Sequence, residues 1–365
     1  MKKVTGMQPY DAILLLSFGG PEAAEEVMPF LRRVTAGRGI PDERLEAVGE
    51  HYFLFGGRSP INDQNRALIT AIRDELQARG EATPVIWGNR NSAPFLEDAL
   101  REAHAAGYRR LVTVTTSAYS SYSSCRQYRE NLAEALDTLR EDGLDLEVDK
   151  IAPYAPRPGF RSANLEKVVA ALRALDGVPD QQIALLYVTH SIPEAMDETS
   201  GPGDGDGHLY QRQHLALASA LTDEANTVLG RNLIGELVFC SRSGPPTQPW
   251  LEPDVNDRLQ ELAADGRSAV VAAPIGFVSD HMEVVYDLDT EAAATAARLG
   301  LRFVRAATVG SDPVFVADLV DAVAERAAEA RGEPVPNFEG RMPSVCAAGC
   351  CPNLRTARPA HCGKD

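Results

Sequence analysis

The chain has 365 residues, of which 44% are hydrophobic and 24% are charged, enough for about two domains with sizeable cores. Its formal net charge of −16 argues against a general nucleic-acid binder, because that function needs clustered Lys and Arg. No uncharged apolar run approaches the roughly 20 residues of a membrane span. The N-terminal stretch MKKVTGMQPYDAILLLSF fits a first β-strand better than a signal peptide. We therefore expect a cytoplasmic protein without a membrane span.

Apolar runs typical of strands alternate with helical patterns along the whole chain. The predicted strands are 12–18, 84–90, 110–116 and 146–151, then 183–191, 233–241, 269–277 and 302–309. Between them, segments such as 66–80 and 164–177 carry apolar residues at helical spacing. Apolar strands that alternate with helices indicate parallel sheets covered on both faces. The predicted fold is therefore α/β, with two Rossmann-like halves, each a four-stranded parallel sheet flanked by helices, and a cleft between them.

The predicted boundaries follow from composition. Three prolines in 152–160 separate an N-terminal half, residues 1–155, from a C-terminal half, residues 156–335. The remaining residues, 336–365, form a Cys-rich tail.

Polar motifs follow five of the predicted strands. They are SFGGPE, TTSAYSSYSSC, THSIPEAM, SRSGPPTQPW and FVSDHMEVVYD. Sites in parallel sheets form beyond the carboxyl ends of the strands, so these motifs predict one site lined from both halves. His190 ends the fifth strand, and its imidazole can take up and return a proton near neutral pH. The alternative is a satisfied histidine in a strand-to-loop turn.

Three carboxylates recur every four residues after the seventh strand. On an α-helix, Glu283, Asp287 and Glu291 would share one face and span roughly 12 Å. A solvated face is the ordinary reading of such a pattern. However, no Lys or Arg lies between Asp280 and Glu291, so the carboxylates repel one another. A divalent cation would offset that repulsion, which makes the row a candidate metal path.

The cysteines are concentrated at the C-terminus. Of six, four lie in the last 20 residues: Cys346, Cys350, Cys351 and Cys362. Clustered thiols in a cytosolic chain favour a soft metal centre over disulfides. The Cys-x3-Cys-Cys spacing matches neither a standard ferredoxin nor a paired zinc motif. A fourth ligand would come from Cys362 or from a distant residue such as Cys125.

Several of these stretches together resemble the ferrochelatase family, in particular its actinobacterial coproporphyrin III type. The matching stretches are LLLSFGGPE, GGRSPINDQ, TSAYSSYSSCRQYREN, VTHSIPE, GPPTQPWLEP and IGFVSDHMEVVYDLD. The resemblance implies an enzyme that inserts ferrous iron, as a substrate, into a porphyrin during haem biosynthesis. It also implies that the last helix packs back toward the first half.

The resemblance assigns roles to individual residues. It implies that His190 and Glu283 are catalytic and contact the substrate iron, and that Asp287 and Glu291 form an outer metal path. The residues it implies for porphyrin binding are Phe18, Arg32, Arg33, Arg58, Ser59 and Tyr128. It further implies a 2Fe–2S cluster on Cys125, Cys346, Cys350 and Cys351, with Cys362 left over as a possible substitute.

Other functions stay open at this stage. They are a protoporphyrin IX ferrochelatase, a chelatase that loads cobalt into another tetrapyrrole, and a porphyrin or haem carrier without catalysis. A two-domain solute-binding protein is a weaker alternative. We expect the porphyrin and ferrous iron as the partners of a monomer that also makes transient contacts with other haem-pathway enzymes, with no nucleic acid.

Overall fold

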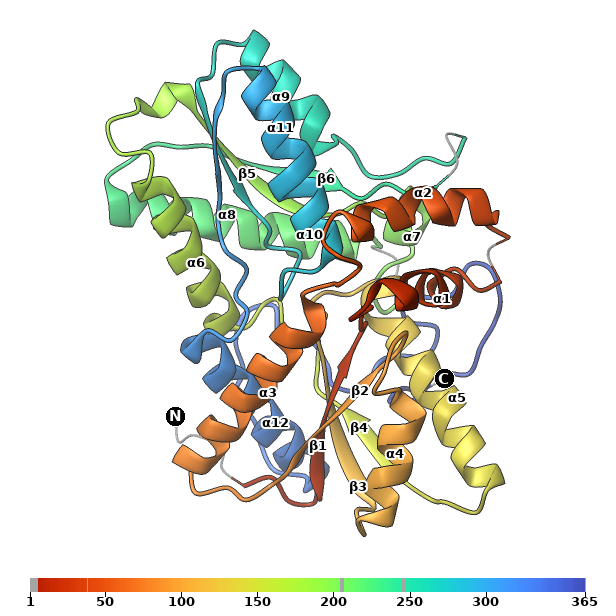
Figure 1. Ribbon diagram of the computed structural model, residues 1–365. Helices are drawn as coiled ribbons and strands as arrows, with labels where there is room; N and C mark the ends of the chain where they lie inside the picture. Colours follow the sequence, from red (N-terminus) through yellow and green to blue (C-terminus); the bar gives the residue numbers. More distant parts are fainter. Residues whose placement is uncertain (1–5, 38, 204–206, 245–246, 365) are drawn as a thin grey trace.

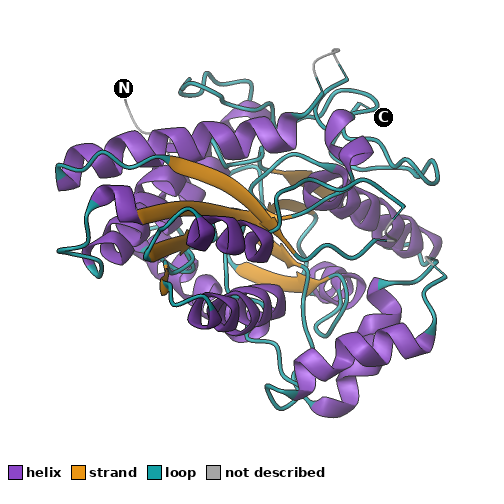
Figure 2. Cartoon of the chain, turned by 90° about the horizontal axis from the view of Figure 1, so that it is seen from above, coloured by secondary structure: helices purple, strands orange, loops and turns teal. Residues whose placement is uncertain are grey.

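The computed structural model describes residues 6–37, 39–203, 207–244 and 247–364 (Figure 1). Residues 1–5 of the N-terminal stretch and residues 245–246 of the Pro-rich loop, both used in the sequence predictions, lie outside these ranges. Two four-stranded parallel sheets form the core, which confirms the predicted α/β fold. Seen from above, helices surround the strands (Figure 2).

Both sheets have the same strand order. The first sheet runs β2 (Val85–Asn89), β1 (Ala12–Ser17), β3 (Arg110–Thr115) and β4 (Glu147–Lys150). The second runs β6 (Gly235–Cys240), β5 (Ile183–His190), β7 (Ala269–Ala273) and β8 (Arg302–Arg305). In each sheet, the second strand in the chain lies on one side of the first strand, and the third and fourth strands lie on its other side. That reversal places a topological switch point between β1 and β3, and another between β5 and β7.

The predicted strands and the observed ones agree in number and order but differ at their ends. All of β1 and β7 is buried, as their continuous apolar sequences require. The seventh predicted strand, 269–277, was too long, because β7 ends at Ala273. Pro274 follows, and its missing N–H group cannot continue the ladder.

Helices cover both sheets. In the first half they are α1 (Ala24–Val34), α2 (Asp42–Phe53), α3 (Ile61–Ala78), α4 (Leu96–Ala105) and α5 (Gln127–Glu141). In the second half they are α6 (Pro158–Arg173), α7 (Glu194–Glu198), α8 (Leu209–Leu229), α9 (Val255–Ala264), α10 (Met282–Tyr286), α11 (Ala293–Arg298) and α12 (Pro313–Ala330). Within the described residues, none of these helices has the length and apolarity needed to cross a membrane.

The last helix, α12, packs against α3 and β3 of the first sheet as well as against α6 (Figure 1). Ion pairs reinforce this packing: Arg79 reaches Asp321 at 2.5 Å, and Arg326 reaches Asp149 of β4 at 2.6 Å. Helix α12 therefore links the first sheet to α6 of the second half.

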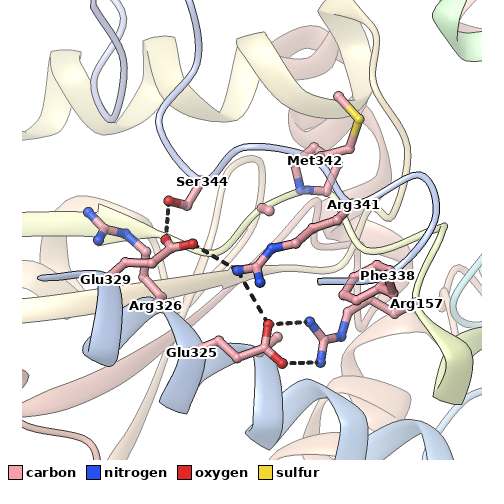
Figure 3. A pocket seen from close by; sticks show the side chains of 11 residues that line it. Arg157, Glu325, Arg326, Glu329, Phe338, Arg341, Met342 and Ser344 are labelled. Atoms are coloured by element: carbon pink, nitrogen blue, oxygen red, sulfur yellow. Dashed lines mark hydrogen bonds and ion pairs between the residues drawn. The ribbon is translucent and has the colours of Figure 1, made fainter. Parts of the chain in front are cut away.

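The C-terminal tail is fixed to α12 by a cluster of charged side chains that we call the tail anchor: Arg157, Glu325, Glu329, Arg341 and Ser344 (Figure 3). Arg157 donates two hydrogen bonds to Glu325, at 2.9 and 3.0 Å. Arg341 lies 2.8 Å from Glu329 and 3.5 Å from Glu325, and Ser344 also donates to Glu329. The tail anchor holds the chain just before Cys346, the first cysteine of the tail.

Candidate active site

His190 lies at the carboxyl end of β5, beside the switch point between β5 and β7. Its ring Nδ1–H donates to the backbone carbonyl of Ser191. That bond fixes the neutral tautomer, so Nε2 is left as the basic nitrogen. Nε2 lies 3.5 Å from Oε1 of Glu283, with the two side chains 31% and 46% exposed. The structure thus brings the two predicted catalytic residues together at a solvent-accessible position.

Glu283 lies between two imidazoles. His281, the N-cap residue of α10, accepts a hydrogen bond from the Glu283 backbone N–H at 3.2 Å through Nδ1. The same Nδ1 is 3.5 Å from Oε2 of Glu283. Burial acts to raise the pKa of Glu283, but the charges of His190 and His281 outweigh it and lower that pKa to about 2. Glu283 is therefore a carboxylate at all physiological pH values.

The two histidines respond differently to this carboxylate. Burial acts to lower the pKa of His190, but the charge and hydrogen bonding of Glu283 outweigh it, so the pKa of His190 is raised. For His281 burial dominates, and its pKa is lowered. His190 is therefore the better proton acceptor of the pair.

The helix carrying the carboxylate row is not the α-helix that the spacing predicted. Helix α10 ends at Tyr286, and residues Asp287–Ala292 form a π-helical segment. Its wider turn means that Asp287 and Glu291 do not continue one α-helical face from Glu283. Short π-helical segments of this kind are frequent at functional sites.

Asp287 is the second carboxylate of the site. It accepts a hydrogen bond from the hydroxyl of Ser241, just after β6. Burial, together with the charges of Glu283 and Glu291, raises the pKa of Asp287 to about 7. The neighbouring carboxylates therefore make ionisation of Asp287 less favourable, as expected from repulsion between like charges.

The local arginine does not neutralise this row. Arg305 pairs with Asp280 at 3.0 Å and with Asp289 at 2.6 Å. Glu291 instead accepts a hydrogen bond from Asn256 at 3.3 Å. In the described part of the chain, no Lys or Arg forms an ion pair with the carboxylate row of Glu283, Asp287 and Glu291. No Lys or Arg therefore competes with a cation for these carboxylates, and a bound cation would favour the ionised form of Asp287.

The first half closes over this site through α2 and α3. The ring of His51 stacks on Tyr286 with centroids 3.6 Å apart. Burial and the charges of Glu283 and Asp287 raise the pKa of Tyr52 above its ordinary value. Gln64 exchanges two hydrogen bonds with the backbone of Asp280, at 2.8 and 2.9 Å. The site therefore lies where the two halves meet.

The residues predicted to bind porphyrin fall into two groups. Arg32 and Arg58 are exposed and form ion pairs with Asp42 and Asp63 at 2.8 and 2.6 Å. Phe18 directly follows β1, Ser59 precedes α3 and Tyr128 lies in the first turn of α5. Arg33 lies in the last turn of α1 and donates to the Asn91 carbonyl at 2.9 Å. Ser59 and Tyr128 are only 3% and 4% exposed. Contact with a porphyrin requires these two residues to be uncovered.

Residues 10–327 of this chain match the family model of ferrochelatases. The chain belongs to the ferrochelatase family. It is 52% identical over 372 residues to the coproporphyrin III ferrochelatase of Streptomyces coelicolor, a match that covers 100% of this chain and 99% of that protein. It is 49% identical to the coproporphyrin III ferrochelatase of Leifsonia xyli, covering 99% of this chain and 96% of that protein.

Among solved structures, SirB from Bacillus subtilis with Fe3+ superposes with a TM-score of 0.49 and 12% identity, covering 88% of this chain and 97% of that one. Ferrochelatases are metal chelatases, so the expectation of an enzyme is confirmed by the family match.

Four cysteines of this ferrochelatase lie together. Cys125, from the π-helical turn before α5, joins Cys346, Cys350 and Cys351 of the tail in one buried cluster of free thiols. The Sγ atoms of Cys350 and Cys351 are 3.7 Å apart. Cys362 lies outside this cluster, and its thiol donates to the carbonyl of Val148 at 3.2 Å.

The four thiols match the donor set of a 2Fe–2S cluster in number and type. Across the described residues, however, no group of three or more His, Cys, Asp or Glu side chains is arranged so that it could hold a metal ion.

Sequence reasoning missed some residues of the ferrochelatase site. The guanidinium of Arg90 lies 4.5 Å from the ring of Tyr128 and 5.6 Å from that of Phe18. Arg90 ends the second predicted strand, so the rule applied to the other strand ends would have found it. Ser241 follows another strand end, but its contact with Asp287 depends on the folding of the loop after β6.

Proposed function

We propose that this enzyme inserts ferrous iron into coproporphyrin III, giving iron-coproporphyrin III for haem biosynthesis. The contact between His190 Nε2 and Glu283 Oε1, at 3.5 Å where the two halves meet, carries the proposal. The names of the relatives at 52% and 49% identity support coproporphyrin III as the substrate.

Metal insertion exchanges two pyrrole protons for one Fe2+, with no net electron transfer. The two protons require an acceptor near the ring nitrogens. His190 suits this role because its Nδ1–H is held by Ser191, which leaves Nε2 as the base. Nε2 would take one proton at a time, and the His190 side chain, 31% exposed, would release the first to water before it accepts the second. Its raised pKa favours proton uptake, and the adjacent carboxylate of Glu283 stabilises the imidazolium that forms.

Glu283 has a second role in this proposal. Because its pKa is about 2, it remains an anionic oxygen ligand for iron as the cation approaches the ring. Asp287 and Glu291 would hold hydrated iron farther out, since no Lys or Arg ion pair competes for them in the described chain. Each carboxylate would bind the cation weakly enough to release it inward.

The first half would hold the porphyrin. Arg32 and Arg58 already bind carboxylates, those of Asp42 and Asp63, and a propionate group can replace either partner at an exposed position. Phe18, whose ring lies 5.6 Å from the Arg90 guanidinium, offers an aromatic ring for stacking rather than an oxygen ligand for iron.

A zinc-insertion assay, followed by the fluorescence of the metalloporphyrin, tests this function. We expect purified enzyme to metallate coproporphyrin III and to prefer it over protoporphyrin IX when both compete. Porphyrin binding without metal insertion would indicate a carrier. Preference for protoporphyrin IX, or for cobalt in a different tetrapyrrole, would replace the proposed substrate.

We also propose a 2Fe–2S cluster on Cys125, Cys346, Cys350 and Cys351. The buried grouping of these free thiols supports it, as does the Gly201 N–H that donates to Cys351 Sγ at 3.2 Å, because such bonds tune iron–sulfur centres. Anaerobically purified protein should absorb visible light and be bleached by dithionite. A colourless, folded sample with bound zinc would point to zinc instead.

We further propose a cellular location and an oligomeric state for the enzyme. We place it in the cytoplasm as a monomer that meets porphyrin and ferrous iron there. Light scattering on the purified protein would measure the molecular mass, and fractionation of cells would locate the enzyme.

A further inference from the structure

The N-terminus of α8 is capped by residues outside the helix. In the described structure, the N-cap residue His208 makes no side-chain capping hydrogen bond, although the first N–H groups of a helix need partners. Instead, the Ser200 hydroxyl accepts from the Tyr210 N–H at 3.0 Å, and the Asp197 carboxylate accepts from the Gln211 N–H at 3.1 Å. The end of α7 and the residues just after it therefore fix where α8 begins.

The same segment is bonded in both directions to a cysteine of the tail. The Gly201 N–H donates to Cys351 Sγ at 3.2 Å, and the Cys351 N–H donates to the Gly201 carbonyl at 2.9 Å. Gly201 has a φ of 111°, and a Cβ there would lie 3.3 Å from Leu209. Since Ser200 and Cys351 are both only 2% exposed, this contact has little freedom. A displacement of Cys351 would therefore move the Ser200–Gly201 turn as well.

Tyr210 connects the start of α8 to His190. Its hydroxyl donates to the His190 backbone carbonyl at 2.8 Å and lies 2.8 Å from the Thr189 hydroxyl. Below them, His214 Nδ1–H donates to the Tyr210 carbonyl at 2.7 Å, and its Nε2 is 2.9 Å from the Thr189 hydroxyl. Burial lowers the pKa of His214 to about 3, so the ring is neutral and Nε2 accepts from Thr189. These bonds fix the backbone that carries His190.

We propose that Tyr210 is a positioning residue for His190, and that the Ser200–Gly201 turn links it to Cys351 of the cysteine cluster. The order of contacts is Cys351, Gly201, Ser200, Tyr210 and His190. Through it, the state of the four thiols sets the distance between the His190 imidazole and Glu283. The inference rests on the proposed function, because kcat reports on His190 only if that residue accepts protons.

The chain offers a matched control on the same strand and helix. The hydroxyl of Tyr187 lies 3.0 Å from Thr222 and joins β5 to α8 as Tyr210 does, but its partner is Thr222 rather than the His190 backbone. Tyr210→Phe and Tyr187→Phe each remove one buried hydroxyl. If the Tyr210 hydroxyl only satisfies a buried polar group, the two variants will behave alike.

The first experiment compares these variants as full-length holoenzymes in zinc insertion into coproporphyrin III. We expect Tyr210→Phe to lower kcat about tenfold, the loss usual for groups that orient a reacting residue, with the porphyrin KM within about twofold. Tyr187→Phe should leave kcat within about twofold of wild type at a similar melting temperature. Equal kcat values in the two variants would overturn the positioning role.

The second experiment tests the link to Cys351 without relying on activity. Hydrogen–deuterium exchange is measured on wild type, Cys351→Ser, Ser200→Ala and Tyr187→Phe. We expect faster exchange of the Gly201 and Tyr210 amides in Cys351→Ser and Ser200→Ala, and wild-type exchange there in Tyr187→Phe. Because Cys351→Ser can fail to fold, Ser200→Ala provides an independent break in the same link.

Wild-type exchange at Tyr210 in a folded Cys351→Ser variant would overturn the link. The double variant Ser200→Ala/Tyr210→Phe tests the coupling between these residues. If its fold loss in kcat equals the product of the two single fold losses, the coupling is overturned, because residues that share contacts do not act additively. If the wild-type enzyme inserts no metal into any porphyrin, the proposed function fails, whereas the exchange experiment still decides whether Cys351 controls the start of α8.

Discussion

The tail anchor and the carboxylate row are both rich in charge, yet they differ in how that charge is balanced. In the tail anchor, Glu325 and Glu329 are paired with Arg157 and Arg341 (Figure 3). In the carboxylate row, the described residues supply no Lys or Arg ion pair, although Arg305 pairs with neighbouring carboxylates. Paired buried charges fix a segment in place, whereas an unbalanced row retains affinity for a cation.

The largest expected effect comes from His190, which contacts Glu283 of the row. His190→Ala removes the proposed proton acceptor, so kcat should fall by about 10²–10⁴-fold, the contribution typical of general acid–base residues. Coproporphyrin binding, measured by fluorescence quenching, should stay close to wild type. Near-wild-type turnover would show that His190 is not the proton acceptor.

The tail anchor should respond through stability instead. Arg157→Ala leaves Glu325 and Asp318 buried without their main partner, and breaking such a pair costs about 3 kcal/mol of unfolding free energy. Chemical denaturation measures this loss. Arg140→Ala, which removes an exposed ion pair to Asp137, is the control and should change stability little. Equal losses in the two variants would mean that the tail anchor does not stabilise the fold.

Asp287 and Asp289 provide a smaller test within the acidic segment itself. Asp287→Ala should raise the KM for iron about tenfold, as expected for a residue that delivers a metal, and should affect the porphyrin KM less. Asp289→Ala, whose native carboxylate is paired with Arg305, should leave the iron KM near wild type. A rise confined to the porphyrin KM would contradict a metal path.

The smallest expected effect is a dependence of stability on pH. The pKa of Asp287 is raised from 3.8 to about 7, so the folded state binds its proton more tightly than the unfolded state does. Ionisation of Asp287 therefore lowers the free energy of unfolding as the pH rises from about 4 to about 7. Asp287→Asn should match wild type in melting temperature near pH 4 and exceed it by a few degrees at pH 8. The opposite trend would show that the carboxylate is stabilised when charged.

Much of the fold could be predicted because the central strands are buried on both faces. The continuous apolar runs that became β1, β5 and β7 leave little doubt about their place in a sheet. The position of His190 was predictable for a related reason: it is the polar residue at which such a run ends. The strand ends were less certain, since they depend on single residues such as Pro274.

Other features depend on contacts that the sequence does not encode locally. The π-helical segment Asp287–Ala292 has the same carboxylate spacing as an α-helix, and only the packing of its neighbours selects between the two. Likewise, Ser241 lies 46 residues from Asp287 and becomes its partner only when β6 and α10 are assembled. The ion pair of Arg32 with Asp42 likewise depends on how α1 and α2 pack together.

Because the two sheets share one strand order, the ends of their first strands occupy corresponding positions in the two halves. The first strand of one sheet leads into the aromatic ring of Phe18, and the first strand of the other ends in the imidazole of His190. The same position in two similar sheets thus carries an aromatic ring in one half and an imidazole in the other. An aromatic ring suits a flat organic molecule, whereas an imidazole suits metal ions and protons. Under the proposed function, the same strand order used twice would bring a flat organic molecule and a metal ion to adjoining positions.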